Sequence, residues 1–156
     1  MSAPIVPLTS RIPVKSRIIS VSSAGNFQNN KDYSQRFLAK NINEGKAYFF
    51  KTKADGTYDI EIIITDNEKI IETLELDDEL IDRSTPAIIK LSQNAEVGDV
   101  DYLGSEYSFK FKINPGNYLV RIFFTGNDVE FYGFKIVLLP ITQEAKNNFL
   151  LIDSLK

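Results

Sequence analysis

The stretch EYSFKFKINPGNYLVRIFFTGNDVEFYGFKIVLLP, residues 106–140, decides the fold class. It contains three runs in which apolar and polar residues alternate, and such alternation puts the apolar side chains on one face of a β-strand. Asn114-Pro115-Gly116-Asn117 separates the first two runs and is typical of a turn, because Pro presets φ and Gly accepts a positive φ. The pattern predicts three adjacent antiparallel strands. Their apolar faces are Tyr107, Phe109, Phe111 and Ile113, then Tyr118, Val120, Ile122 and Phe124, and then Tyr132, Phe134, Ile136 and Leu138.

Further strands are predicted on the N-terminal side of this stretch. Asp55-Gly56 lies between two β-type runs and predicts a tight hairpin, since a type I′ turn needs positive φ at both central residues. After this turn, alternate residues are expected to face the core, namely Tyr58, Ile60, Ile62 and Ile64. The expected strands cover residues 15–22, 45–52, 57–65 and 86–91, with a short edge strand at 95–102.

The remaining segments complete the predicted architecture. Residues 1–14 contain three prolines and form an arm that is either mobile or laid along a sheet edge. Spacing predicts a short helix at residues 32–41 and a C-terminal helix at residues 142–155. Residues 66–82 fit helical and strand spacing alike, and we favour a strand or loop there. The predicted fold is all-β, an antiparallel β-sandwich of about seven to eight strands in a single domain over residues 15–156, with a short C-terminal helix.

The composition excludes several kinds of chemistry. The chain has 156 residues, enough for one domain with a core, and it contains neither cysteine nor histidine. Disulfides, zinc–thiolate sites and a Ser–His–Asp triad are therefore ruled out, and no nucleotide-binding glycine motif is present. We expect a protein that is not an enzyme and uses no cofactor. The sequence shows no signal peptide or membrane-spanning stretch, so a soluble cytoplasmic protein is expected.

Charge is distributed unevenly, although the net charge is only −3. Residues 1–53 carry nine basic and two acidic side chains, whereas residues 66–106 carry twelve acidic and three basic ones. The basic residues are dispersed without an RNA-recognition signature, so nucleic-acid binding is not expected. An acidic surface can dock on a basic protein, where complementary fields speed association and orient the partner. The candidate partner-binding residues are Glu72, Glu75, Asp77, Asp78, Glu79 and Asp82, together with Asp99 and Asp101.

These acids have two other interpretations. A run of charges is most often a solvated loop with no partner. Asp99 and Asp101, together with Asp128, could instead supply carboxylate oxygens to calcium at one end of the sandwich, although the EF-hand pattern is not matched.

The order of features from Tyr33 to Pro140 resembles the competence protein J family, inhibitors of the DNA-entry nuclease, and related bacterial immunity-type proteins. The final strand, ending in Leu138-Leu139-Pro140, resembles the closing strand of that family. The chain differs from the family in lacking tryptophan, in the arm before residue 30 and in the predicted helix after residue 140. The resemblance implies a β-sandwich that binds and blocks a nuclease or similar toxin and is not itself an enzyme. The other matching pieces are Gly45-Lys-Ala-Tyr-Phe-Phe, Asp55-Gly-Thr-Tyr-Asp-Ile-Glu-Ile, the PAIIKL strand from Pro86, and Ile113-Asn-Pro-Gly-Asn-Tyr-Leu-Val-Arg-Ile-Phe-Phe.

A second class of function also fits the sequence, a structural or ligand-binding sandwich module that self-assembles into a homo-oligomer. Phe123 and Phe131, next to Phe124 and Tyr132, would form an exposed apolar patch if they lay on an outer face, and such a patch marks an interface. The same residues suit an ordinary core. A hydrolase that uses carboxylates alone is disfavoured, because acid–base catalysis without histidine needs environments that this sequence does not display.

Overall fold

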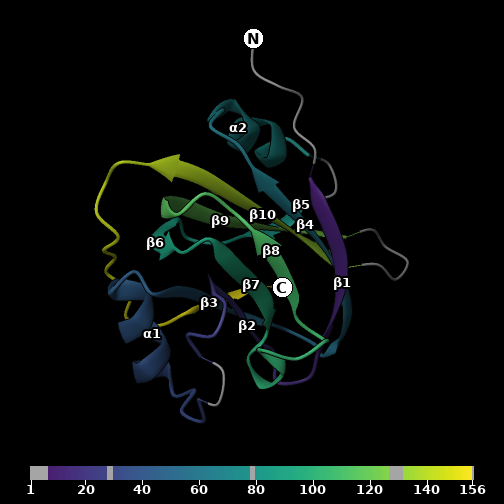
Figure 1. Cartoon of the computed structure of the whole chain (residues 1–156). Helices are drawn as coiled ribbons and strands as arrows, with labels where there is room; N and C mark the ends of the chain where they lie inside the picture. Colours follow the sequence, from purple (N-terminus) through teal and green to yellow (C-terminus); the bar gives the residue numbers. More distant parts are fainter. Residues whose placement is uncertain (1–6, 28–29, 78–79, 127–131, 156) are drawn as a thin grey trace.

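Two β-sheets face each other, with one α-helix against the outer side of each (Figure 1). The computed structural model describes residues 7–27, 30–77, 80–126 and 132–155. These residues form eleven strands, two α-helices and one short 3-10 helix. The strands are β1 (Leu8–Val14), β2 (Ile18–Ser23), β3 (Ala47–Thr52), β4 (Gly56–Ile64), β5 (Leu80–Arg83), β6 (Ala87–Leu91), β7 (Asn94–Asp99), β8 (Phe109–Lys112), β9 (Gly116–Gly126), β10 (Tyr132–Ile141) and β11 (Asp153–Leu155). The helices are α1 (Gln35–Asn43), α2 (Lys69–Glu75) and the 3-10 helix η1 (Val100–Tyr102).

The first sheet has the order β1-β4-β10-β9-β5, and β6 also pairs with β9. β10 runs parallel to β4, whereas the other neighbours are antiparallel. Phe134 lies opposite Ile60 on one side and Phe124 on the other, so the apolar rows of three strands align. The predicted antiparallel pairing of the second and third runs is confirmed by β9 and β10. The parallel pair corrects the prediction of a purely antiparallel sandwich.

The second sheet has the order β11-β3-β2-β7-β8. The strands predicted at residues 15–22 and 45–52 pair here as β2 and β3. β7 lies between β2 and β8, so the edge position predicted for residues 95–102 is wrong. β11 runs parallel to β3 and closes the other edge.

The core lies between the sheets and is rich in aromatic rings. The ring centroid of Phe134 lies 5.1 Å from those of Phe50, Tyr58 and Phe124. Phe50 belongs to the second sheet, so these contacts join the two layers. Aromatic pairs of this kind contribute about 0.5–1.5 kcal/mol each beyond the burial of apolar area. Two of the residues predicted to lie on apolar faces are exposed instead, Ile64 at 37% and Tyr107 at 51%. Those that are buried are Tyr58, Ile60, Ile62, Phe111, Ile113, Tyr118, Val120, Ile122, Phe124, Phe134, Ile136 and Leu138.

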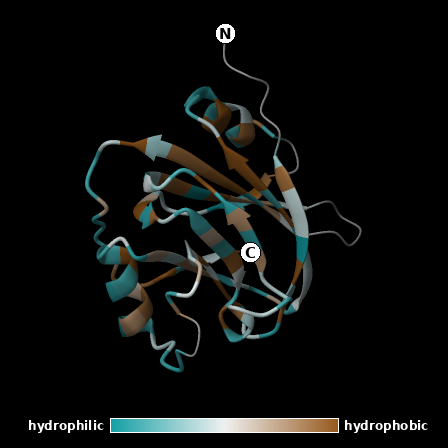
Figure 2. Ribbon diagram, viewed as in Figure 1, coloured by the Kyte–Doolittle hydropathy of each residue, from teal (hydrophilic) through white to brown (hydrophobic). Residues whose placement is uncertain are grey.

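Each helix covers the outer face of a sheet. Leu74 of α2 packs with Phe123 and Val137 on the outside of the first sheet. On the second sheet the ring of Phe49 points outward to Phe27, 5.3 Å away, and α1 lies over this region. Figure 2 shows hydrophobic colouring on α2 as well as on the strands beneath it. Both faces of the central strands are therefore buried.

This four-layer arrangement explains the run Phe123-Phe124. Phe124 faces the core between the sheets, and Phe123 is fully buried beneath α2. Of the two interpretations of Phe123, an exposed patch or an ordinary buried residue, the structure supports the second. Phe131, the other residue of that predicted patch, lies outside the described residues.

Two predicted hairpins are instead crossings between the sheets. β3 lies in the second sheet and β4 in the first, and β8 and β9 are divided in the same way. The two crossings have the same local structure. Each new strand begins at a glycine with positive φ, Gly56 in β4 and Gly116 in β9. The hydroxyl of the tyrosine two residues later donates a hydrogen bond of 2.5 Å, from Tyr58 to the C=O of Ala54 and from Tyr118 to the C=O of Asn114. The turn residues were recognised correctly, but they redirect the chain into the other layer.

The predicted C-terminal helix is wrong. Residues 142–152 follow an irregular course beside α1 and end in β11. The amide side chain of Asn43 bonds to both the N–H and the C=O of Phe149, at 2.5 and 2.9 Å. The amide of Asn147 does the same for Ile88, at 2.7 and 2.8 Å. These side chains replace the backbone pairing that a helix or another strand would supply.

The two ambiguous segments are now defined. Residues 69–75 are helix α2, so the strand or loop favoured over residues 66–82 is wrong there, whereas β5 matches a strand at its end. In the predicted arm, β1 lies along the edge of the first sheet and pairs with β4. The helix predicted at residues 32–41 is confirmed as α1, which begins after Ser34, whose side chain accepts a bond from the N–H of Phe37.

Candidate functional site

The described acidic residues of the 66–82 segment lie on α2, on β5 or immediately beside α2, which covers the outer side of the first sheet (Figure 1). Two of them hold the helix to the sheet. Glu75 pairs with Arg121 of β9 at 3.0 Å, and Asp77 pairs with Lys135 of β10 at 3.3 Å. Their charges are partly neutralised within the molecule, so they contribute less to an outward-facing field than the sequence implies.

Other acids of this segment remain open to solvent. Glu72 is exposed, and so are Asp66 and Glu68 immediately before the helix. None of these three forms an ion pair with another described residue. Asp66 and Glu68 were not among the predicted site residues, although they belong to the same run of acids. They extend the exposed negative charge to the N-terminal end of α2.

Two apolar side chains are exposed among these acids. Leu76 at the end of α2 is 83% exposed, and Ile81 of β5 is 44% exposed. Asp82 is half-buried beside Ile81 and accepts a hydrogen bond from the N–H of Arg83. Asp78 and Glu79, which complete the predicted set, lie outside the described residues. Apolar side chains framed by charge are typical of the centre and rim of a protein interface. We call Asp66, Glu68, Glu72, Leu76 and Ile81 the acidic face.

Asp99 does not belong to this face. It lies in the second sheet, is fully buried, and accepts hydrogen bonds from Lys15 N, Ser16 N, Ser16 Oγ and Asp101 N at 2.6–2.8 Å. The carboxylate holds the turn between β1 and β2 and is not available to a partner. Asp101 is exposed on η1, beside the second sheet rather than the first. The structure therefore does not bring these two residues together with the 66–82 acids.

The calcium interpretation finds no support in the geometry. The oxygens of Asp99 are already occupied by donors. In the part of the chain that the structure describes, no group of three or more acidic side chains is arranged to hold a metal ion. Asp128 lies outside the described residues.

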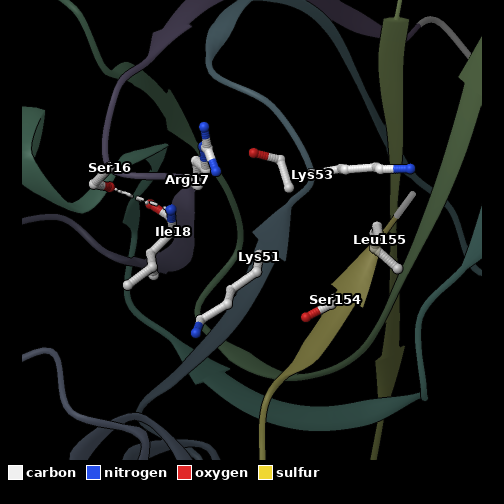
Figure 3. Close-up of a pocket in the computed structure, with 8 residues that line it drawn as sticks. Ser16, Arg17, Ile18, Lys51, Lys53, Ser154 and Leu155 are labelled. Carbon is white, nitrogen blue, oxygen red and sulfur yellow. Dashed lines mark hydrogen bonds between the residues drawn. The ribbon is translucent and has the colours of Figure 1, made fainter.

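An open cavity of about 510 Å³ lies at the end of β2, β3 and β11, and Arg17, Lys51 and Lys53 line it (Figure 3). None of these cations has an ion-pair partner among the described residues. Their charged groups point away from one another rather than to a common centre. The arrangement does not form a focused anion site.

No family model matches the chain, and no curated protein matches its sequence. Two solved structures share the fold. One is ComJ from Bacillus subtilis, an inhibitor of the DNA-degrading activity of NucA, with a TM-score of 0.63 and 11% identity over 89% of this chain and 100% of that one. The other is the product of crocagin biosynthetic gene J, with a TM-score of 0.57 and 11% identity over 91% of this chain and 100% of that one.

At this level of identity the comparison shows a shared fold and no more. The overlap nevertheless takes in nearly the whole chain, so the resemblance to the competence protein J family noted from the sequence extends to the three-dimensional arrangement. Among the described residues, no helix is long and apolar enough to span a membrane.

Proposed function

We propose that this protein is a non-catalytic inhibitor or immunity protein that binds a basic nuclease or a similar toxin through the acidic face. The observation that carries the proposal is the combination of a ComJ-like fold with exposed acids that make no ion pair with a described residue and that lie around two exposed apolar side chains. The fold alone does not specify a function. The face supplies the chemistry that a basic partner would recognise.

The acidic face would act by electrostatic complementarity. A nuclease must carry cations where it holds the phosphates of its substrate, and a protein surface with carboxylates can occupy the same groove. Long-range attraction would steer the encounter, and Leu76 and Ile81 would supply the apolar contact that slows dissociation. Glu75 and Asp77 serve mainly to fix α2 on the sheet, so they position the face rather than form its centre.

Charge reversal tests this assignment. The variant Asp66→Lys/Glu68→Lys/Glu72→Lys changes three exposed side chains that make no ion pair among the described residues, so the fold should be retained. The partner for this test is a nuclease captured from native cell lysate on the immobilised protein at low salt. We expect the association rate with this nuclease to fall by about 10- to 100-fold at low salt, because steering is lost. The difference should shrink as salt is added. Stopped-flow or surface-based kinetics at several ionic strengths measure this.

A matched control reverses the same amount of charge elsewhere. Asp101, Glu106 and Glu144 are exposed and lie away from α2. Their reversal should leave the association rate within about threefold of the native value, because field effects weaken beyond a Debye length of about 8 Å at physiological salt. Equal slowing in both variants would show that net charge, and not the acidic face, drives binding.

A further inference from the structure

Leu150 and Leu151 are consecutive leucines that the fold leaves in solvent. Leu150 is 88% exposed and Leu151 is 65% exposed. Single exposed apolar residues are common, but adjacent ones that form one apolar surface mark an interaction site. Neither leucine belongs to an apolar cluster formed by the described residues.

The structure also holds the two leucines in place. On one side, Asn43 of α1 bonds to both backbone groups of Phe149, whose ring packs edge-on against Tyr48 at 6.1 Å. On the other side, the N–H of Ile152 donates to the side-chain oxygen of Gln35 at 3.3 Å, and Ile152 itself is buried. The leucine pair is therefore presented from a short segment anchored to α1 at both ends. Prior ordering of this kind lowers the entropy cost of binding.

The leucines form one wall of an open groove of about 570 Å³, and the exposed side of α1 forms the other. Along α1 the groove is lined by Arg36, Lys40 and Glu44, which lie at successive i, i+4 positions. Arg36 makes no ion pair with any described residue. Glu44 lies 3.0 Å from Lys46 and 3.9 Å from Lys40, and the hydrogen bond from Lys46 holds the pKa of Glu44 below its ordinary value.

We infer that this groove binds a second copy of the same chain, with the two α1 helices antiparallel about a two-fold axis. Residue 40 is the midpoint between Arg36 and Glu44, which are separated by about 12 Å along the helix axis. An antiparallel partner therefore places Arg36 of each copy opposite Glu44 of the other. The leucine pairs of both copies then meet beside the helices, and one surface is complementary to itself, as a two-fold interface requires.

Two cations oppose this contact, and one of them is Lys46, which lies 3.0 Å from Glu44 and so comes near Arg36 of the other copy. Lys40 lies at the midpoint, so the two copies bring their Lys40 ammonium groups close to the axis. The long side chain can reach toward its own Glu44, but some repulsion remains. The association is therefore expected to be weak and reversible, in the micromolar range.

Sedimentation velocity on the purified full chain, from about 5 to 500 μM, tests the inference. We expect a monomer–dimer equilibrium that the variant Leu150→Ser/Leu151→Ser weakens at least about tenfold, because its apolar centre is lost. Leu76→Ser removes an equally exposed leucine on the opposite outer face and should leave the equilibrium unchanged. A monomer at every concentration, or equal weakening by Leu76→Ser, would overturn the proposal.

A charge exchange tests the antiparallel alignment itself. Arg36→Glu and Glu44→Arg should each weaken the dimer severalfold, because each leaves like charges opposed. The double variant Arg36→Glu/Glu44→Arg restores opposite charges across a two-fold axis and should recover most of the native affinity. Additive weakening in the double variant would contradict the alignment. The assay contains no nuclease, so its result is independent of the proposed inhibitor function.

Discussion

At the scale of single residues, Asp99 shows how a buried carboxylate organises a distant turn. It binds the backbone of Lys15, 84 residues away, and that of Ser16 and Asp101. Replacing it with alanine would leave three part-buried N–H groups without this acceptor. We expect Asp99→Ala to lower the free energy of unfolding by about 2–4 kcal/mol, because bonds to a charged acceptor contribute about 1.5–3 kcal/mol and the orphaned donors add a desolvation cost. Urea denaturation at neutral pH measures the loss.

The matched control for this variant is Asp101→Ala. Its side chain is exposed, and only its backbone N–H contacts Asp99. The expected change is within about 0.5 kcal/mol. Similar losses in both variants would mean that Asp99 does not hold the turn in the way described.

The buried side chain of Tyr48 should make the stability of the protein depend on pH in the alkaline range. Burial raises the pKa of Tyr48 far above its ordinary value, and its hydroxyl donates to Asp153 at 2.9 Å. The folded state therefore keeps the proton while the unfolded phenol begins to ionise near pH 10. Stability should be unaffected by this group below pH 10 and should fall as pH rises above that value.

The variant Tyr48→Phe separates this contribution from the rest. We expect lower stability at pH 8, because a hydrogen bond is lost, but a shallower decline between pH 8 and pH 11. Some decline should remain, because burial also raises the pKa of Tyr33 and Tyr118. Urea denaturation at pH 8 and pH 11 measures the free energy of unfolding of both proteins. An equal decline in the native protein and the variant would exclude Tyr48 as a cause.

At the scale of elements, Asn147 fixes the C-terminal segment to β6, on the edge that does not pair with β9. Its amide makes three hydrogen bonds, to the N–H and C=O of Ile88 and to the C=O of Ile42. We expect Asn147→Ala to cost about 1–3 kcal/mol and to speed hydrogen exchange at the amide of Ile88. Asn148→Ala is the control, because this neighbour is exposed and makes no hydrogen bond with the described residues. Unchanged exchange at Ile88 would argue against the edge-pairing role.

These elements also show what sequence patterns can and cannot specify. Alternation located most strands, because it depends on neighbours along the chain, and spacing located α1. The sheet to which a strand belongs depends on distant partners, so the Gly-x-Tyr crossings at Gly56 and Gly116 looked like hairpin turns. The repeated Gly-x-Tyr was the available signal for the crossings. The C-terminal segment was misjudged because its backbone bonds go to side chains of Asn43 and Asn147, which no local pattern reveals.

At the scale of the whole molecule, the sequence indicated where acidic charge lies but not how much of it is free. Glu75 and Asp77 form ion pairs with Arg121 of β9 and Lys135 of β10. These partners are distant in the sequence, since Lys135 lies 58 residues from Asp77. Asp99 of the second sheet is buried, and its carboxylate accepts hydrogen bonds from the turn between β1 and β2. The structure adds that Leu76 is exposed, and that Asp66 and Glu68 make no ion pair with a described residue whereas Glu75 and Asp77 do.

The two proposed contact surfaces lie on opposite outer faces, with α2 over the first sheet and α1 over the second (Figure 1). Self-association through α1 would therefore leave the acidic face open in both copies. A variant that abolishes dimerisation should still bind its partner, and the charge-reversed acidic face should still permit dimers. The two proposals can thus fail independently.

We propose that the protein inhibits a nuclease by binding it. The most direct measurement is plasmid degradation by the nuclease captured at low salt on the immobilised protein, with increasing amounts of the purified protein added back. We expect protection to saturate near a molar ratio of one to one, and the Asp66→Lys/Glu68→Lys/Glu72→Lys variant to need at least about tenfold more protein. If a nuclease is captured but the protein in excess leaves plasmid degradation unchanged, or if no nuclease is captured at low salt, the account is contradicted.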